Sequence, residues 1–317
     1  MIKALSLGVT ASFFFAFTFV LNRRIQVSGG HWIWSSSLRF FFMLPMLFPL
    51  LVPRKRYRVV FTEIRKNPYS WFLWSTVGFG IFYASISMAA SYGPSWLIAS
   101  TWQITIVAGA LLTPLFYETD VGDKRKNTRR KMPIRQLAVS AFILAGVALV
   151  QAKVEGAALD VFGVIGMLLI VVAAFAYPLG NRKMMNMVPA DFGTIERIFG
   201  MTLCSMPFWA ALSIAGIASN IMPSRGQLLQ TFLVALFSGV VATILFFKST
   251  ELVRNDPGRL AVVESTQAGE VVFALIGGLL LSDDPKPSIV SLIGILIIII
   301  GIALNGFLAR KNSDKPA

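Results

Sequence analysis

The chain has 317 residues, of which 56% are hydrophobic and only 14% charged, and its mean hydropathy is +0.70. Because a soluble domain carries about a quarter charged residues, this composition excludes a soluble enzyme or binding domain. The net charge of +14 does not indicate nucleic-acid binding, since the basic residues cluster in short segments between apolar runs, as they do in membrane proteins. Cys204 and His31 are single copies, so we expect no disulfide within the chain, no metal site and no cofactor.

Ten segments are long and apolar enough to predict transmembrane α-helices, each of which needs about 20 residues. The segments are 3–22, 32–52, 70–91, 94–116, 135–153, 158–179, 192–215, 227–251, 258–281 and 288–309. The first ends in Asn22-Arg23-Arg24 without a small-residue cleavage site, so we expect a retained helix and not a signal peptide. The predicted fold class is an all-α integral membrane protein with ten transmembrane helices.

The basic residues predict how these helices are oriented. With a cytoplasmic N-terminus, 22 of the 29 Lys and Arg residues fall on the cytoplasmic side, five fall on the other side, and Arg39 and Lys248 lie within helices. Cytoplasmic segments of membrane proteins are enriched in Lys and Arg. The sequence therefore predicts that both termini are cytoplasmic, together with the basic loop 117–134, which we expect to contact anionic lipid.

The two halves of the chain carry similar residues in the same order. Asn22-Arg23-Arg24 ends the first predicted helix and Asn181-Arg182-Lys183 the sixth, and Ser100-Thr101 of the fourth corresponds to Ser265-Thr266 of the ninth. Because five helices per half is an odd number, the second copy must be inverted relative to the first. Inverted repeats are typical of transporters that work by alternating access. The two predicted five-helix repeats are residues 1–153 and 154–317.

Several segments spread along the chain together form a recognisable pattern. They are Phe19–Arg23, Ser28–Ser35, Leu38-Arg39, and Glu264–Gln267 with Gly269–Val272. In this order they resemble the drug/metabolite transporter superfamily, and in particular its ten-span, EamA-like branch of multidrug resistance efflux transporters. The resemblance implies a two-fold pseudosymmetric helix bundle with a central cavity and no ATPase. One departure is Trp102-Gln103 in the fourth helix, where many relatives carry a proline.

Glu270 is the first candidate for a functional residue. It lies about twelve residues into the ninth predicted helix, near the middle of the membrane, and has no charged neighbour in sequence. Ionisable residues at this depth are costly and usually face the interior of a helix bundle. We expect Glu270 to bind a proton or a cation, the alternative being a protonated carboxyl that only hydrogen-bonds to a neighbouring helix.

Glu264 and Gln267 extend this polar face toward the cytoplasm. Residues three positions apart share one face of a helix, so Glu264, Gln267 and Glu270 are predicted to line a cavity together. Glu264 and Lys248 lie equally far from the turn at Asp256 and therefore at similar depth. We expect them to form an ion pair with a structural or gating role.

Two arginines occupy corresponding positions in the two halves, Arg39 in the second helix and Arg197 in the seventh. The expected role of Arg39 is structural, tying its helix to carbonyl groups or to a carboxylate, with substrate binding as the alternative. Arg197 follows Glu196 near the cytoplasmic face, and we expect its long side chain to reach the water interface.

A second group of candidates is predicted to face Glu270 across the pseudo-two-fold axis. Aligning the two serine-threonine pairs places Thr105 opposite Glu270, with Trp102 and Gln103 beside it. Two further rings that could line the cavity are Tyr83 and Tyr177. For each ring, packing against helices or lipid is the alternative. A carboxylate surrounded by aromatic rings suits a lipophilic cation, which is attracted by the charge and by the faces of the rings.

These patterns predict a secondary transporter of the plasma membrane, not an enzyme. The expected substrates are small lipophilic or amphipathic cations exported by alternating access, with proton coupling through Glu270 as a hypothesis. No Gly-x-x-x-x-Gly-Lys motif occurs, which argues against nucleotide as the energy source. A monomer contains both repeats and is expected to be sufficient, surrounded by membrane lipids.

Two alternatives remain open. The first is an exporter or facilitator of an amino acid, another metabolite or a lipid-linked compound, which Arg39 and Lys248 would favour for a substrate with an anionic group. The second is a membrane-embedded lipid-modifying enzyme. That alternative is remote, because the loops 53–69 and 117–134 are basic and contain no cluster of His, Asp and Glu.

Overall fold

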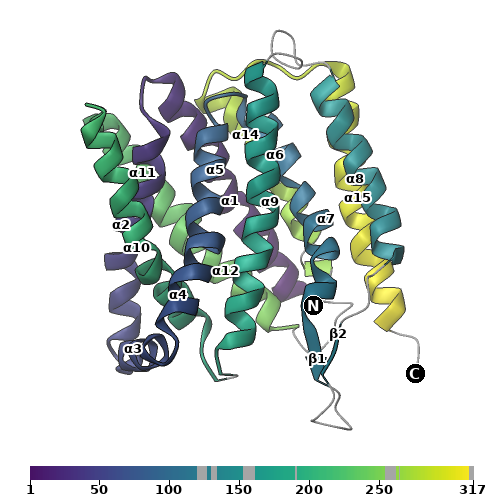
Figure 1. Cartoon of the computed structure of the whole chain (residues 1–317). Helices are drawn as coiled ribbons and strands as arrows, with labels where there is room; N and C mark the ends of the chain where they lie inside the picture. Colours follow the sequence, from purple (N-terminus) through teal and green to yellow (C-terminus); the bar gives the residue numbers. More distant parts are fainter. Residues whose placement is uncertain are drawn as a thin grey trace.

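Long helices lie side by side through the height of the molecule in the computed structural model (Figure 1). The structure describes residues 1–119, 127–129, 134–152, 161–189, 191–253, 262–263 and 265–313. Within these residues, six helical stretches are long and apolar enough to cross a membrane. They are α1 (Ile2–Val27), α2 (Trp32–Leu51), α4 (Pro68–Ser75) continued by η1 (Thr76–Ile81) and α5 (Phe82–Ala89), α9 (Val161–Met187), α10 (Thr194–Ala218), and α11 (Arg225–Val234) continued by η3 (Ala235–Ala242) and α12 (Thr243–Glu251).

Four further apolar helical stretches contain 10–17 residues when only the residues with described side chains are counted. They are α6 (Ser95–Trp102) with α7 (Ile104–Leu111), α8 (Ile134–Ala152), η4 (Ser265–Ala268) with α14 (Gly269–Leu281), and α15 (Ile289–Ser313). Each of the ten segments expected from hydropathy thus contains helical residues. Two of them are interrupted, at Gln103 and at Ala268, and two contain the π-helical segments η1 and η3, none of which hydropathy alone indicates.

The lower end in Figure 1 carries two elements that are not membrane helices. The short helix α3 (Arg56–Lys66) contains four basic residues and follows α2. The strands β1 (Tyr117–Thr119) and β2 (Asn127–Arg129) pair antiparallel, with Glu118 opposite Thr128, just after the short helix η2 (Thr113–Leu115). The all-α prediction did not include this ladder, because strands of three residues are too short to leave a pattern in sequence.

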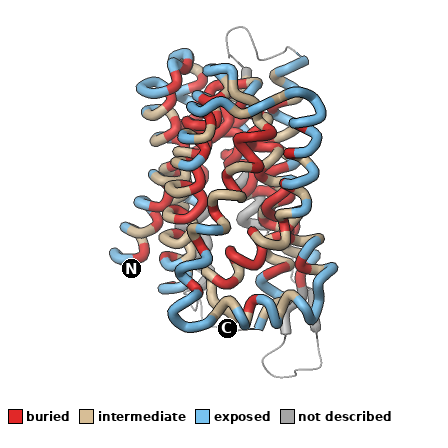
Figure 2. The backbone as a smooth tube through the Cα atoms, turned by 90° about the vertical axis from the view of Figure 1, so that its left-hand side faces the viewer, coloured by how far each residue is buried: buried red, intermediate tan, exposed pale blue. Residues whose placement is uncertain are grey.

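The distribution of buried and exposed residues is typical of a protein that faces lipid. Exposed residues lie on the outside of the bundle and buried ones between the helices (Figure 2). The exposed side chains include large apolar groups, such as Leu280 at 74% and Ile289 at 77%. Small hydroxyl residues such as Ser35, Ser100 and Ser249 are instead fully buried. Because exposing so much apolar surface to water is unfavourable, these helices are arranged to be surrounded by lipid.

Glycines allow pairs of these helices to approach closely. A Cβ atom built on Gly180 of α9 would lie 2.4 Å from Gly78 Cα in η1 and 2.8 Å from the Trp74 carbonyl oxygen. Likewise, Cβ atoms at Gly146 of α8 and Gly294 of α15 would each lie 2.7 Å from the carbonyl oxygen of the other glycine. Helices in membranes associate through such small residues, because apolar side chains gain little by leaving lipid.

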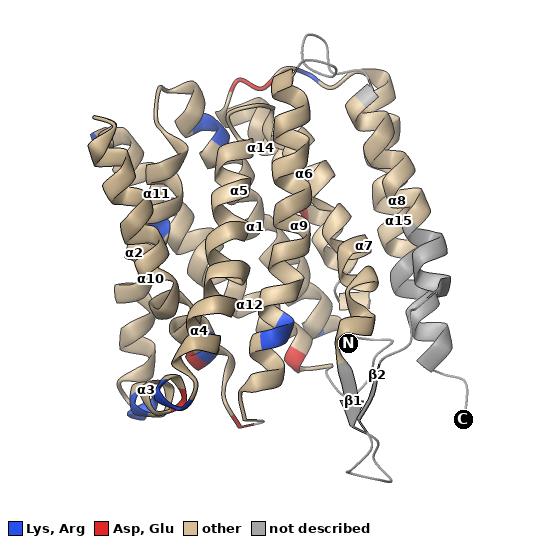
Figure 3. Cartoon of the chain, viewed as in Figure 1, with Lys and Arg blue, Asp and Glu red and all other residues tan. Residues whose placement is uncertain are grey.

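Charged side chains gather near the two ends of the helices, with few between (Figure 3). At the upper end, Arg23 Nε lies 3.5 Å from Asp284 Oδ1, and Asp284 Oδ2 accepts hydrogen bonds from Ser95 N, at 2.8 Å, and from Ser95 Oγ. Arg24 Nη1 donates to Leu281 O at 2.8 Å. Because both arginines have partners here, α1 continues to Val27, five residues past its predicted end.

Helix α2 begins with a cap on the same upper side. The residue before its first turn, His31, accepts a hydrogen bond from Ile33 N through Nδ1 at 3.3 Å. Burial lowers the pKa of His31, which favours the neutral ring that can accept this bond. Gln227 Nε2 of α11 donates to His31 O at 2.7 Å and so joins the start of α2 to α11.

Replacing Gly180 by alanine is expected to destabilise the protein by about 1–3 kcal/mol, because the added methyl group meets backbone atoms that cannot rotate away. Thermal unfolding of the purified protein in detergent would measure the loss. Gly226→Ala in α11 is the matched control, since its Cβ would meet only Ser224 Oγ at 3.8 Å. Equal melting temperatures for the two variants would contradict the close crossing of α9 and η1.

Asp284→Asn is expected to cost about 1–3 kcal/mol of stability, because it removes the charge that pairs with Arg23 and weakens the acceptor for Ser95. The neighbouring Asp283→Asn makes the same chemical change at an exposed position, and asparagine tolerates the positive φ of 51° found there. We expect that control to change stability by less than about 0.5 kcal/mol. If both variants unfold at one temperature, the upper contacts do not stabilise the bundle.

Candidate functional site

A cavity of about 690 Å³, including its mouth, lies among the helices of both halves of the chain. Its lining comes from α1, α2, η1, α5 and α6 of the first half and from α9, η3, α12, η4 and α14 of the second. Polar groups in this lining are Thr18, Arg39, Asn181, Ser238, Thr243, Gln267 and Glu270, and the rest are aromatic or apolar. Ligand sites are typically apolar cavities that contain a few polar groups.

Glu270 lies on this lining and is only 3% exposed. The chain reaches it through the short 3₁₀ helix η4, after which α14 begins at Gly269 and carries Glu270 in its first turn. The N-terminus of a helix bears a partial positive charge, which favours a carboxylate at this position. No hydrogen bond or ion pair joins Glu270 to another described residue, so its carboxyl group is available to a ligand in the cavity.

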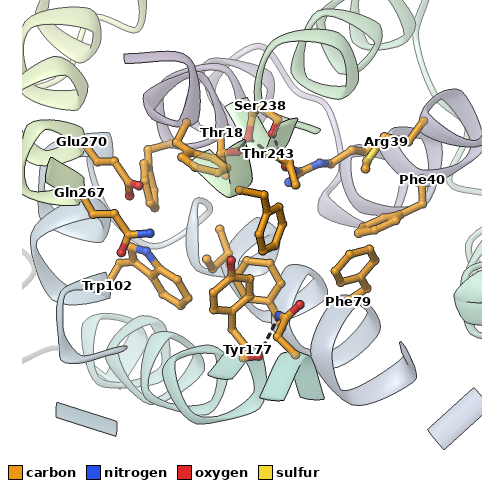
Figure 4. Close-up of a pocket in the computed structure, with 17 residues that line it drawn as sticks. Thr18, Arg39, Phe40, Phe79, Trp102, Tyr177, Ser238, Thr243, Gln267 and Glu270 are labelled. Carbon is orange, nitrogen blue, oxygen red and sulfur yellow. Dashed lines mark hydrogen bonds between the residues drawn. The ribbon is translucent and has the colours of Figure 1, made fainter. Parts of the chain in front are cut away.

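Gln267 precedes Glu270 by one turn and lines the same side of the cavity (Figure 4). Glu264, expected on the same face, lies outside the described residues, and so does the expected ion pair between Lys248 and Glu264. The structure places Lys248 in the last turn of α12, where it is exposed and does not line the cavity.

Two of the predicted rings, Trp102 and Tyr177, meet at the cavity wall. Their centroids are 5.7 Å apart, and Phe82 lies 5.3 Å from Trp102 and 4.7 Å from Tyr177. Trp102 is the last residue of α6, so the break at Gln103 ends the helix where the indole reaches the cavity. Aromatic faces near a carboxylate attract organic cations.

Gln103 and Thr105 are buried but do not line the cavity. Gln103 Nε2 donates to Ala99 O at 3.2 Å, and its Oε1 has no hydrogen-bond partner. Thr105 Oγ1 donates to Ala174 O of α9 at 3.2 Å. Both residues therefore sit behind the wall, in the region where α6 gives way to α7.

Arg39 lines the cavity, and Tyr83 lies beneath it. The guanidinium carbon is 3.8 Å from the centroid of the fully buried Tyr83 ring, and Nη2 donates to Ser238 Oγ at 3.3 Å. No carboxylate of the described residues pairs with Arg39. The structural contacts of Arg39 are therefore with neutral groups and not with a carboxylate, and its guanidinium also reaches the cavity.

Arg197 lies outside the lining but close to it. Its guanidinium carbon is 4.9 Å from the ring centroid of Phe247, which lines the cavity, and it interacts electrostatically with Tyr177. Its neighbour Glu196 pairs with Arg56 Nε of α3 at 2.5 Å. Arg197 thus places positive charge beside the cavity wall.

Four polar residues of the lining were not predicted: Thr18, Asn181, Ser238 and Thr243. Thr18 Oγ1 and Ser238 Oγ share a short hydrogen bond between α1 and η3. A lone hydroxyl in an apolar run is too common to single out, because it can bond to its own helix backbone. The available signal was Ser238-Gly239, a hydroxyl beside a glycine, which marks a place where another helix comes close.

The site offers binding chemistry and lacks the residues for metal chemistry. Within the described residues, no group of three or more His, Cys, Asp and Glu side chains lies close enough to hold a metal ion. Among the described residues, a carboxylate, a guanidinium and several rings line the cavity, and these groups suit a small organic molecule with charged and apolar parts.

Comparison with known proteins identifies the family to which the chain belongs. The family model described as "EmrE: Putative multidrug resistance efflux transporter" matches residues 2–311. Uncharacterized protein YjlA of Bacillus subtilis (strain 168) is 47% identical over 314 residues, which cover 99% of this chain and 97% of that protein. An uncharacterized 42.1 kDa protein of Shouchella clausii, from the 3' region of intracellular alkaline protease, is 44% identical over 273 residues, covering 84% of this chain and 70% of that protein.

A solved crystal structure has the same fold. Its sequence is 14% identical, the superposition covers 98% of each chain, and the TM-score is 0.62. At this identity the likeness concerns the fold alone. With the family match and six helices able to cross a membrane, the chain belongs to the EmrE-type family of multidrug resistance efflux transporters and is a multi-pass membrane transporter of the drug/metabolite superfamily.

Proposed function

We propose that the chain is a secondary transporter that exports small amphipathic molecules bearing a cationic group across the plasma membrane. The observation that carries the proposal is the cavity between the two halves, where the buried carboxyl group of Glu270 faces aromatic rings and has no partner among the described residues. A carboxyl group in that position can hold either a proton or the cationic group of a substrate. Exchange of one for the other would couple export to the proton gradient.

The proposal includes ten transmembrane helices in two inverted repeats. Two interruptions at matching places support the repeat: α7 begins directly after Gln103 and α14 directly after Ala268. Each break follows a serine-threonine pair at the same spacing, Ser100-Thr101 in one half and Ser265-Thr266 in the other. Broken helices near the membrane centre form the substrate sites of many transporters with inverted repeats.

Two further pairs of elements support the same symmetry. The third and eighth helical stretches each contain a π-helical segment, η1 and η3. The fifth and tenth, α8 and α15, pack along one another at one side of the bundle (Figure 1). Such a correspondence is what two similar five-helix units facing each other would produce.

The proposed orientation places the lower end of Figure 1 in the cytoplasm. Helix α1 begins and α15 ends in the lower half of the picture, and the basic helix α3 lies at the bottom. Basic residues on this side agree with the usual enrichment of Lys and Arg in cytoplasmic segments. The cavity lining includes residues in the lower part of α9 and in α12, whereas Arg23, Ser95 and Asp284 join elements at the upper end. This arrangement supports a cytoplasm-facing state of an alternating-access cycle.

A second candidate is a transporter of metabolites such as amino acids or lipid-linked compounds. Arg39 favours it, because a guanidinium on the cavity wall is a binding group for carboxylate or phosphate. The family of transporters favours both candidates over the membrane-embedded enzyme considered from the sequence.

Glu270→Gln is expected to lower cation-dependent proton flux by about tenfold or more, because the amide can neither carry the proton nor pair with a cation. The measurement is the change in lumenal pH of proteoliposomes when tetraphenylphosphonium or another lipophilic cation is added. Glu251→Gln, an exposed carboxyl at the end of α12, is the matched control and should retain the flux. Transport that persists unchanged in Glu270→Gln would refute proton coupling through this residue and indicate a facilitator.

A further inference from the structure

The cavity carries an unpaired charged group on each of two opposite sides. Glu270 and Gln267 lie on one side, and Arg39 lies on the other (Figure 4). The ion pairs within the described residues are Arg23–Asp284, Arg56–Glu196 and Lys66–Glu63. Neither cavity group takes part in them, although an isolated charge in a protein interior is costly.

Arg39 is held in place by neutral groups alone. Its side chain is buried, with the residue 6% exposed, and its guanidinium rests on the ring of Tyr83 and donates to Ser238 Oγ. Its Nε has no hydrogen-bond partner. These contacts orient the guanidinium, but they supply no negative charge and leave donors unused.

The neighbours of Arg39 are themselves fixed. Asn22 Nδ2 donates to the Tyr83 hydroxyl at 3.1 Å, and Ser238 is bonded to Thr18. At Gly239, a Cβ atom would lie 2.6 Å from Met43 Sδ and 3.4 Å from Arg39 Nε, so η3 packs closely against α2 beside the arginine. The guanidinium is thus positioned before any ligand arrives, which lowers the entropic cost of binding an anion there.

The opposite wall offers the complementary charge. The Glu270 carboxyl lies at the start of α14, and the Gln267 amide lies beside it, both without a partner among the described residues. The rest of the lining is mostly aromatic and apolar, with Phe40 and Phe79 on the side of Arg39 and Trp102 on the side of Glu270 (Figure 4). The cavity therefore has an anion-binding side, a cation-binding side and an otherwise mostly apolar lining.

The geometry points to a zwitterionic substrate: a molecule with an aromatic or apolar body, a cationic group that Glu270 binds and an anionic group that Arg39 binds. This inference rests on the proposed function, in that the cavity is taken as the transport site. A substrate with a cation alone would leave Arg39 unpaired and would bring a second positive charge near it. A substrate with an anion alone would leave Glu270 with only a proton to bind, so that wall would add no charge contact. A zwitterion with its charges at separate ends pairs with both Glu270 and Arg39 at once. Guanidinium groups bind carboxylates through two parallel hydrogen bonds.

Three probes that share one body test the inference. They are 4-(2-aminoethyl)benzoate, which is a zwitterion, its methyl ester, which is a cation, and its N-acetyl derivative, which is an anion. Uptake of each into proteoliposomes containing the full chain is measured by mass spectrometry, with tetraphenylphosphonium as a cation lacking any anionic group. We expect the wild type to transport the zwitterion about tenfold faster than the ester or the N-acetyl compound at limiting concentration, as one charge-assisted contact would give.

Arg39→Gln is expected to lower the ratio of zwitterion transport to ester transport from about tenfold to about one. Arg225→Gln, an exposed arginine at the start of α11, is the matched control and should keep the preference. Ser238→Ala removes the hydroxyl that accepts from Arg39 and that is bonded to Thr18, but it keeps the guanidinium, and we expect an intermediate preference. If Arg39→Gln does not fold, the wild-type ranking of the three probes and Ser238→Ala still decide the question.

Four outcomes overturn the inference. Ester transport as fast as zwitterion transport by the wild type would show that Arg39 does not bind substrate, and so would an unchanged preference in Arg39→Gln. If tetraphenylphosphonium is carried while the zwitterion is not, the inference fails and the proposed export of cations stands. If none of the four compounds enters faster than it enters protein-free liposomes, both the inference and the proposed function fail.

Discussion

An ionised side chain inside a membrane protein needs a partner, because lipid and protein screen charge far less than water does. In the described part of this chain, the ion pairs of Arg23 with Asp284 and of Arg56 with Glu196 join separate elements, at the upper end of α1 and at α3. Arg39 and Glu270, in contrast, lie within helices and have no charged partner, and both reach the same cavity. Within the described residues, these two ion pairs thus join separate elements, whereas Arg39 and Glu270 are left for a small molecule in the cavity.

Irregular helices make this placement possible. A continuous helix satisfies its own backbone groups and offers only side chains, whereas the interruption at η4 starts a new helix with Glu270 in its first turn. Similarly, the break after Trp102 ends α6 at the cavity, and the π-helical segments η1 and η3 contribute Phe79 and Ser238 to the lining. Such irregular turns often occur at functional sites, since they redirect side chains that a regular helix would point elsewhere.

Close helix contacts and polar bonds at the ends hold the frame around the cavity. Gly78 and Gly180 let η1 and α9 touch through backbone atoms, so the wall that carries Phe79 and Tyr177 is tightly packed. At the upper end, Arg23, Arg24 and Ser95 contact the last residue of α14 and the segment that follows it. At the lower end, Arg182 Nη1 donates to Gly109 O at 2.6 Å. Polar contacts of this kind can exchange one arrangement for another more easily than packed apolar surfaces can, which suits a protein proposed to open alternately at its two ends.

The sequence by itself determined where apolar helices occur and which family they form. Length and hydropathy suffice to locate the helices, because a segment surrounded by lipid must be apolar and must satisfy its own backbone hydrogen bonds. It also indicated Glu270, Gln267, Trp102 and Tyr177, since polar and aromatic residues stand out in an apolar run, and the structure brings these four to one cavity. Only the tertiary structure decided that Arg39 reaches the cavity, that Tyr83 supports it from below, and that Thr105 and Gln103 lie behind the wall. The direction in which a side chain points depends on local helix breaks and on the neighbouring helices, and a linear pattern contains neither.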